Sequence, residues 1–182
     1  MIIGLLGRSR VGKDSVANII RTAYPEHQFE MMRLSSPIKA AAQALFAFSD
    51  EQIEGVQKED IDARWGVAPR EVFQKITAET MRSMGHDFFT RLLYEKYDKH
   101  NTANPAKSII IPDIRYTHDV TEIHKRGGIV IKVSRGYVSI PKYACEDHLD
   151  SIVDLPTLQN DGTLSELEVN VCALLDPLFE KR

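Results

Sequence analysis

The chain has 182 residues, 43% of them hydrophobic, and a formal net charge of −3. This length suits one domain with a proper core, and the slightly acidic balance gives no support for an overall electrostatic affinity for nucleic acid. The two cysteines, Cys145 and Cys172, are too far apart for a metal-binding spacing, which favours a reducing compartment. The opening apolar run is too short for a signal-peptide core, and no stretch could span a membrane. We therefore expect a cytoplasmic protein without a membrane or nucleic-acid partner.

The N-terminal residues show a strand, a glycine-flanked loop and a helix in direct succession. Residues 1–7 are an apolar run, and residues 16–20 begin a helical pattern. Between them lies the sequence Gly7-Arg8-Ser9-Arg10-Val11-Gly12-Lys13-Asp14-Ser15. This order predicts a phosphate-binding P-loop, and the alternative is a glycine-containing turn without a ligand.

The chemistry of a polyphosphate explains the spacing of this loop. The glycines let backbone N–H groups point inward, the helix adds its positive end, and Lys13 can reach the outer phosphates. The position after the lysine holds Asp14, where the strict pattern has Ser or Thr. A carboxylate is a good Mg2+ ligand, directly or through water, and Ser15 could then bond an inner phosphate.

The rest of the chain alternates between helical and extended patterns. Helices are predicted at 12–24, 35–49, 69–84, 87–99, 117–126 and 163–179, and strands at 29–34, 108–113, 129–133 and 152–155. Together with the first strand, this alternation predicts an α/β fold, a three-layer sandwich around a parallel five-stranded sheet. Ligands of such sheets bind at the carboxyl ends of the strands.

Charged residues follow two of the predicted strands at that edge. Asp113 could hold a water of the Mg2+ shell and Arg115 could neutralise phosphate charge, and the alternative is a surface ion pair. Arg135 could close over a transferring phosphoryl group, and the alternative is a solvated loop charge. The six histidines show no metal-ligand spacing.

One predicted helix carries a further polar group. Arg70 and Gln74 share a face of the helix at 69–84, and Arg82 lies two turns further on. They could read a phosphate and a base edge, although spacing alone favours a polar face in water. Asn160-Asp161-Gly162 is, by pattern, a turn before the last helix.

Several motifs in this order resemble the deoxynucleoside monophosphate kinases, a family best known from large bacteriophages. The resemblance spans nearly the whole chain. Its motifs are Gly-Lys-Asp-Ser in the loop, Ser36-Pro37-Ile38-Lys39, Pro69-Arg70 with Gln74 and Arg82, Asp113-Ile114-Arg115-Tyr116, Gly127-Gly128, and Asn160-Asp161-Gly162-Thr163.

The resemblance implies a single P-loop kinase domain of the nucleoside monophosphate kinase type. Its core would be 1–38 and 105–182, with a helical acceptor-binding insertion at about 39–104 and a short lid at about 135–150. ATP and Mg2+ would be the cofactors, with Asp14 and Asp113 at the metal and Lys13, Asp113, Arg115 and Arg135 at the transferring phosphate. Residues 7–15 would bind the ATP phosphates, and Asn160 and Gly162 would lie near adenine. Lys39, Arg70, Gln74 and Arg82 would bind the acceptor.

The predicted activity is phosphoryl transfer from ATP to a deoxynucleoside 5′-monophosphate, giving the diphosphate and ADP. One alternative is a P-loop kinase of another small metabolite, such as dephospho-coenzyme A, and another is an inactive nucleotide-binding regulator. A nucleic-acid-associated ATPase is disfavoured by the net charge of −3. The accepted bases, the choice between deoxyribose and ribose, and a homodimeric state are left open by the sequence.

Overall fold

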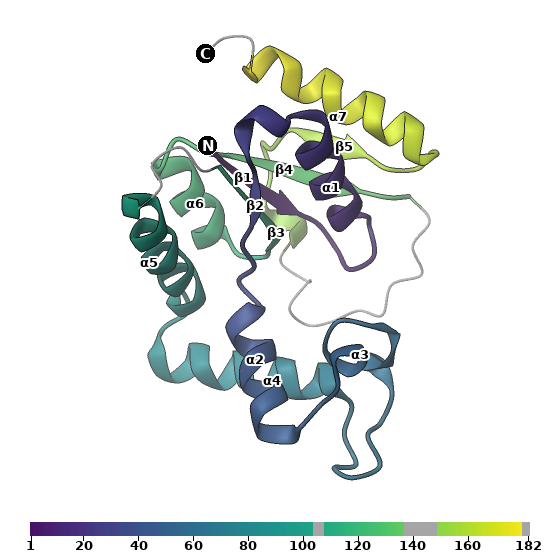
Figure 1. The fold of residues 1–182 in the computed structure, drawn as a ribbon, viewed down its shortest axis with the longest axis vertical. Helices are drawn as coiled ribbons and strands as arrows, with labels where there is room; N and C mark the ends of the chain where they lie inside the picture. The colour runs from purple at the N-terminus through teal and green to yellow at the C-terminus, as the bar shows by residue number, and fades with distance from the viewer. Residues whose placement is uncertain (104–107, 137–148, 180–182) are drawn as a thin grey trace. The chain divides into compact units, whose positions relative to one another are not determined.

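The computed structural model describes residues 1–103, 108–136 and 149–179 (Figure 1). Helices and strands alternate along the described chain as follows: β1 Ile2–Leu6, α1 Lys13–Ala23, β2 Glu30–Met31, α2 Ser36–Phe46, α3 Asp50–Ile53, α4 Pro69–Met84, α5 Phe88–Ala103, β3 Ile109–Ile114, α6 Thr117–Lys125, β4 Ile129–Ser134, β5 Thr157–Gln159 and α7 Leu164–Phe179. The predicted α/β class is confirmed.

Within the described residues, five strands form one parallel sheet in the order β2-β3-β1-β4-β5. β1 lies at its centre, between β3 and β4. After β1, the chain forms β2 at one edge of the sheet and then β3 between β2 and β1. It then crosses to the other side of β1, where it forms β4 and β5. The order of the strands therefore reverses at β1, which is where open α/β sheets bind their ligands.

The last strand was predicted at 152–155, and this prediction is wrong. β5 is Thr157–Gln159, which pairs with the end of β4. Asp154 has a left-handed backbone with φ of 61°, so residues 152–155 cannot continue as an extended strand. Ile152 still packs inside the protein, which explains the apolar pattern that suggested a strand.

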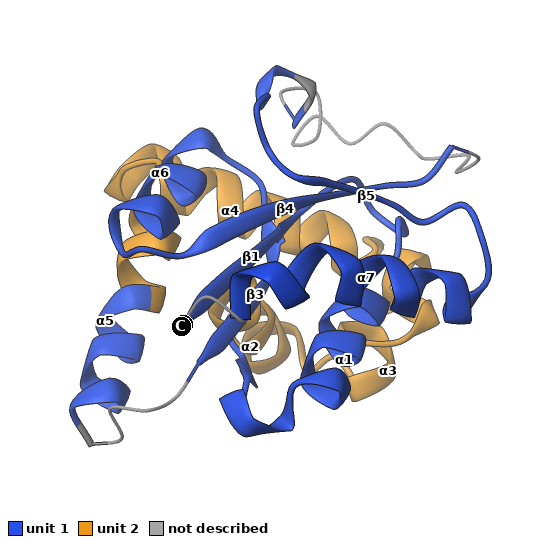
Figure 2. Cartoon of the chain, turned by 90° about the horizontal axis from the view of Figure 1, so that it is seen from above, with its two compact units in different colours: residues 1–33, 94–182 blue, residues 34–93 orange. Residues whose placement is uncertain are grey.

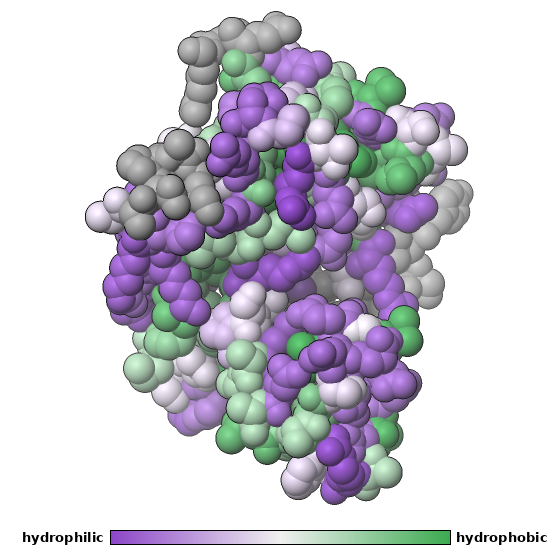
Figure 3. Space-filling model, in the orientation of Figure 1, coloured by the Kyte–Doolittle hydropathy of each residue, from purple (hydrophilic) through white to green (hydrophobic). Residues whose placement is uncertain are grey.

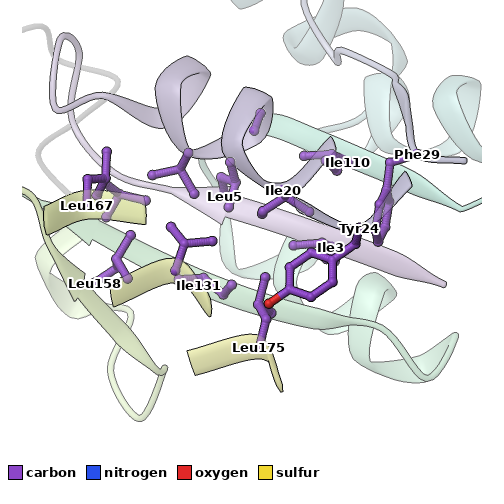
Figure 4. Packing of buried hydrophobic residues seen from close by; sticks show 14 of the residues in the cluster. Ile3, Leu5, Ile20, Tyr24, Phe29, Ile110, Ile131, Leu158, Leu167 and Leu175 are labelled. Carbon is purple, nitrogen blue, oxygen red and sulfur yellow. The ribbon is translucent and has the colours of Figure 1, made fainter. Parts of the chain in front are cut away.

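Alternation along β1 gives the sheet two buried faces. Ile3 and Leu5 belong to a core shared with α1 and α7, which supply Ile20 and Leu175 among others (Figure 4). Gly4 points to the other face, where a Cβ atom would lie 2.5 Å from Ile123 of α6. Helices thus cover both faces of the sheet, as a three-layer sandwich requires.

The chain folds into two compact units (Figure 2). Unit 1 comprises residues 1–33 and 94–182 and contains the sheet; unit 2 comprises residues 34–93. Unit 2 has its own small core, in which Ala42 of α2 and Val72 of α4 pack with Phe48 and Ile53. This core explains why the helical region is compact by itself.

The surface combines polar residues with isolated apolar side chains. On the face drawn in Figure 3, hydrophilic and hydrophobic residues are interspersed. Exposed large apolar side chains come from several elements, among them Leu45, Val56, Ile61, Met84, Leu164 and Val169. In the described part of the chain, no helix has both the length and the apolar character needed to cross a membrane.

Candidate nucleotide-binding site

The loop between β1 and α1 contains two residues with a left-handed backbone, a feature that anion-binding loops share. Arg10 has a φ of 64° and Gly12 has a φ of 95°, both in the left-handed region. Such residues turn successive N–H groups toward a common centre. At Gly7 a Cβ atom would lie 2.3 Å from the carbonyl oxygen of Val133, so only glycine fits beside β4.

Lys13 is the first residue of α1 and folds back over this loop. Its Nζ donates to the carbonyl oxygens of Gly7 at 2.7 Å and Arg8 at 2.6 Å. The N-cap residue is Gly12, which has no side chain to accept from the first-turn N–H groups. The positive end of α1 and the Lys13 ammonium therefore lie at the same loop, as polyphosphate binding requires.

Asp14 has a partner that sequence reasoning missed. Its carboxylate accepts from the Arg33 guanidinium at 2.5 Å, just after β2. Asp14 is exposed, whereas the Arg33 side chain is only 27% exposed. The position of Arg33 in the sequence could have suggested this contact. Arg33 follows a strand whose carboxyl end lies at the same edge of the sheet as the loop.

Asp113 and Arg115 are placed by an irregularity at the end of β3. Gly4 of β1 pairs with Ile111 and Leu6 pairs with Ile114, so two residues of β3 oppose one of β1. Pro112 lies in this bulge, where its missing N–H is tolerated, and the strand continues past it. The bulge thus changes the direction of the strand next to Asp113.

A buried carboxylate fixes the backbone that follows. Asp119 of α6 is 1% exposed, and its Oδ2 accepts from the backbone N–H groups of Arg115 at 3.1 Å and Tyr116 at 2.9 Å. This arrangement starts α6 directly after Arg115. Asp119 was not predicted as a site residue, although an acidic residue in a first helical turn is a usual signal.

The loops after β4 and β5 are tied to each other. Arg135 is exposed immediately after β4, and the backbone N–H of Gly136 donates to Asp161 at 2.5 Å. The predicted lid begins here, but residues 137–148 lie outside the described residues. Asn160 is buried, and its side-chain amide donates to the carbonyl of Val11 in the P-loop at 2.9 Å.

The residues predicted to bind an acceptor lie in unit 2. Lys39 pairs with Glu54, Arg70 donates to Glu59 at 2.6 Å, and Arg82 donates to Glu79 on the exposed surface of α4. The hydrogen bonds from Arg82 hold the pKa of Glu79 below its ordinary value. Gln74 is exposed one turn after Arg70. A phosphate that binds these cations would compete with their carboxylate partners.

The donor set at the P-loop fits Mg2+ held jointly with phosphates. In the described ranges, no group of three or more His, Cys, Asp or Glu side chains gathers into a self-contained metal site. Mg2+ usually takes one or two protein carboxylates and completes its shell with water and substrate phosphate. Asp14, beside Lys13 and Ser15, meets this requirement, and Asp113 offers a second carboxylate at the end of β3.

Comparison with known proteins supports the interpretation of this loop and sheet as those of a P-loop protein. No family model matches the sequence. A protein of Acanthamoeba polyphaga mimivirus named "Putative deoxynucleotide monophosphate kinase" is 30% identical over 97% of this chain and 96% of its own length. Dephospho-CoA kinase from Campylobacter jejuni is 11% identical, with 97% of this chain and 96% of that chain covered and a TM-score of 0.51.

A second solved structure, shikimate kinase from Aquifex aeolicus, has a TM-score of 0.47 at 13% identity, again over 97% of this chain and 96% of that one. The dephospho-CoA kinase likeness shows a shared P-loop kinase fold. The viral relative shows more, because its identity extends over nearly the whole of both chains. The chain therefore belongs to the deoxynucleotide monophosphate kinase family.

Proposed function

We propose that this protein transfers the terminal phosphoryl group of ATP to a deoxynucleoside 5′-monophosphate, giving the deoxynucleoside diphosphate and ADP. The observation that carries the proposal is the loop of residues 7–12 with Lys13 folded over it, at the carboxyl end of the central strand. The viral relative, named for this activity, supports the choice of acceptor.

Phosphoryl transfer needs positioned cations more than it needs a protein nucleophile or base. Lys13 would leave the carbonyls of Gly7 and Arg8 to bind the outer ATP phosphates. Arg115 and Arg135 would neutralise charge that develops on the transferring group. Asp14 and Asp113 would hold Mg2+ directly or through water, and the ion would supply positive charge that neutralises the ATP phosphates.

We assign the donor site to unit 1 and the acceptor site to unit 2. Unit 2 supplies Lys39, Arg70 and Arg82 as phosphate-binding cations and Gln74 as a group that could meet a base edge. Each of these cations is already paired with a carboxylate. The phosphate of the acceptor would therefore compete with these carboxylates for the cations.

Kinetics with a panel of acceptors tests the proposal. Purified protein is mixed with Mg-ATP and, in turn, dTMP, dGMP, dCMP, dAMP, their ribose counterparts and dephospho-coenzyme A, and ADP release is followed. Turnover with one or more deoxynucleotides is the expected result. Turnover with dephospho-coenzyme A alone would identify a different metabolite kinase, and ATP binding without turnover on any acceptor would indicate a regulator.

A further inference from the structure

Asn160 is a buried polar residue that reaches the P-loop from the opposite end of the chain. It lies just after β5, is 7% exposed, and donates its backbone N–H to the carbonyl of Ser134 at 2.8 Å. Its side-chain Nδ2 donates to the carbonyl of Val11 at 2.9 Å, across 149 positions of sequence. Val11 is itself buried, and the hydrogen bond from Asn160 satisfies its carbonyl inside the protein.

The contact between Asn160 and the loop is close as well as polar. A Cβ atom on Gly12 would lie 2.2 Å from Asn160 Nδ2, so the amide occupies the space that a side chain would need. Asp161, the next residue, accepts from the N–H of Gly136 at 2.5 Å. The loop that carries Asn160 is thereby held at both the P-loop and the end of β4.

The hydrogen bond from Asn160 to the Val11 carbonyl also affects the next backbone donor, the N–H of Gly12. The carbonyl of Val11 and the N–H of Gly12 belong to one planar trans peptide and point in opposite directions. A hydrogen bond that fixes the Val11 carbonyl therefore also fixes the direction of the Gly12 N–H. Glycine permits this peptide to rotate more easily than other residues do, so an anchor is needed to hold one orientation.

We propose that Asn160 is a positioning residue for the triphosphate: its amide holds the Val11–Gly12 peptide in the orientation that presents a backbone donor to phosphate. This inference rests on the proposed function for the identity of the ligand. It differs from the role that family resemblance implies, because Asn160 acts here on phosphates through the loop and does not read adenine.

Binding of ligands with and without a base separates these two roles. Affinities of ATP and of inorganic tripolyphosphate, both with Mg2+, are measured for the wild type and for Asn160→Ala. Loss of the anchor should weaken both ligands by a similar factor, about tenfold. Weakening of ATP alone would assign Asn160 to the base and overturn the proposal, as would unchanged affinity for both.

Two further variants isolate the hydrogen bond. Asn160→Leu keeps nearly the size of the side chain, adds no charge and lacks the donor, so it should weaken both ligands at least as much as Asn160→Ala. Gln159→Ala is the matched control, because Gln159 lies one residue earlier and accepts from Ser134 Oγ at 2.5 Å on the exposed surface. It should bind both ligands as the wild type does. Wild-type affinity in Asn160→Leu would contradict the proposal.

Kinetics and hydrogen exchange distinguish positioning from general damage. Asn160→Ala should raise the KM for ATP about tenfold and leave the KM for the acceptor unchanged. Damage to the fold would lower the active fraction without changing either KM, and that result would also contradict the proposal. In nucleotide-free protein, amides of residues 8–13 should exchange faster in Asn160→Ala than in Gln159→Ala. This last comparison tests the anchor even if the wild type proves to bind neither ligand, which would refute the proposed function instead.

Discussion

Asp14 is the residue at which the loop departs from the usual Ser or Thr, and its ion pair with Arg33 gives it a defined partner. In the proposed function, Mg2+ would compete for this carboxylate with the Arg33 guanidinium, which donates to Asp14 Oδ1. Since Asp14 is largely exposed, the pair has a small free energy, of the order of 1 kcal/mol or less. Such a pair can be displaced by a metal ion that arrives with ATP.

Substitution of Arg33 by Ala should therefore favour metal binding at Asp14. The Mg2+ concentration that half-saturates the ATP complex should fall by up to about fivefold at fixed ATP, since a competing cation worth about 1 kcal/mol is removed. A titration with Mg2+ followed by calorimetry measures this. Arg91→Ala, which removes an exposed pair with Asp87, is the control and should have no effect. An unchanged Mg2+ requirement in Arg33→Ala would show that Asp14 does not meet the metal.

At the scale of the elements, the site depends on how closely the P-loop approaches β4. A Cβ atom at Gly7 would meet the backbone oxygen of Val133 at 2.3 Å, and a strand backbone in mid-sheet cannot move aside easily. Gly7→Ala should destabilise the protein by roughly 1–3 kcal/mol, as overpacking usually does. Thermal unfolding measures this loss. Gly136→Ala, whose new Cβ would have only an ordinary contact at 3.4 Å with Asp161, should unfold close to the wild-type temperature. Equal melting temperatures for the two variants would contradict this packing argument.

In unit 2, a short two-residue bridge between Asp62 and Val67 carries a buried carboxylate. Hydrogen bonds from Arg64, and then from Gln52, hold the pKa of Asp62 below its ordinary value. A depressed native pKa contributes stability above the unfolded value, about 4, and that contribution is lost as the pH falls below it.

Asp62→Asn should consequently lower the unfolding temperature at pH 7 and reduce its further decline between pH 4 and pH 3. Asp60→Asn, a neighbouring exposed residue, serves as the control and should follow the wild-type profile. Thermal melts across this pH range provide the measurement. Parallel acid profiles for Asp62→Asn and the wild type would show that Asp62 is not a source of the acid sensitivity.

At the scale of the whole molecule, the chain forms two compact units, and the proposed function assigns the donor site to unit 1 and the acceptor site to unit 2. Hydrogen exchange with single ligands tests this division. Mg-ATP alone should protect amides of residues 7–15 in unit 1, and a deoxynucleoside monophosphate alone should protect amides around Arg70 and Gln74 in unit 2. Protection of unit 1 alone by the monophosphate would contradict the assignment of the acceptor site.

The P-loop and the parallel sheet could be predicted from sequence because their signals are local. An apolar strand, the two loop glycines, a lysine and a helix all lie within the first 23 residues, and each has its own conformational preference. The anchor between Asn160 and Val11 could not be predicted, because it joins residues that only the folded sheet brings together. The last strand was predicted at the wrong residues because Ile152 is an apolar, buried residue in an irregular segment. An apolar residue that is buried outside a strand gives the same sequence signal as one inside a strand.

The measurement that tests the central claim most directly is identification of the product. The protein is incubated with Mg-ATP and an equimolar mixture of the four deoxynucleoside monophosphates, and nucleotides are resolved by mass spectrometry. The account predicts at least one deoxynucleoside diphosphate with the wild type and a rate lower by a factor of about 10² to 10³ with Lys13→Ala, because an outer-phosphate cation is lost. Lys99→Ala, which removes an exposed lysine paired with Glu95, should retain the wild-type rate. ATP consumption without any deoxynucleoside diphosphate, or undiminished product from Lys13→Ala, would contradict the account.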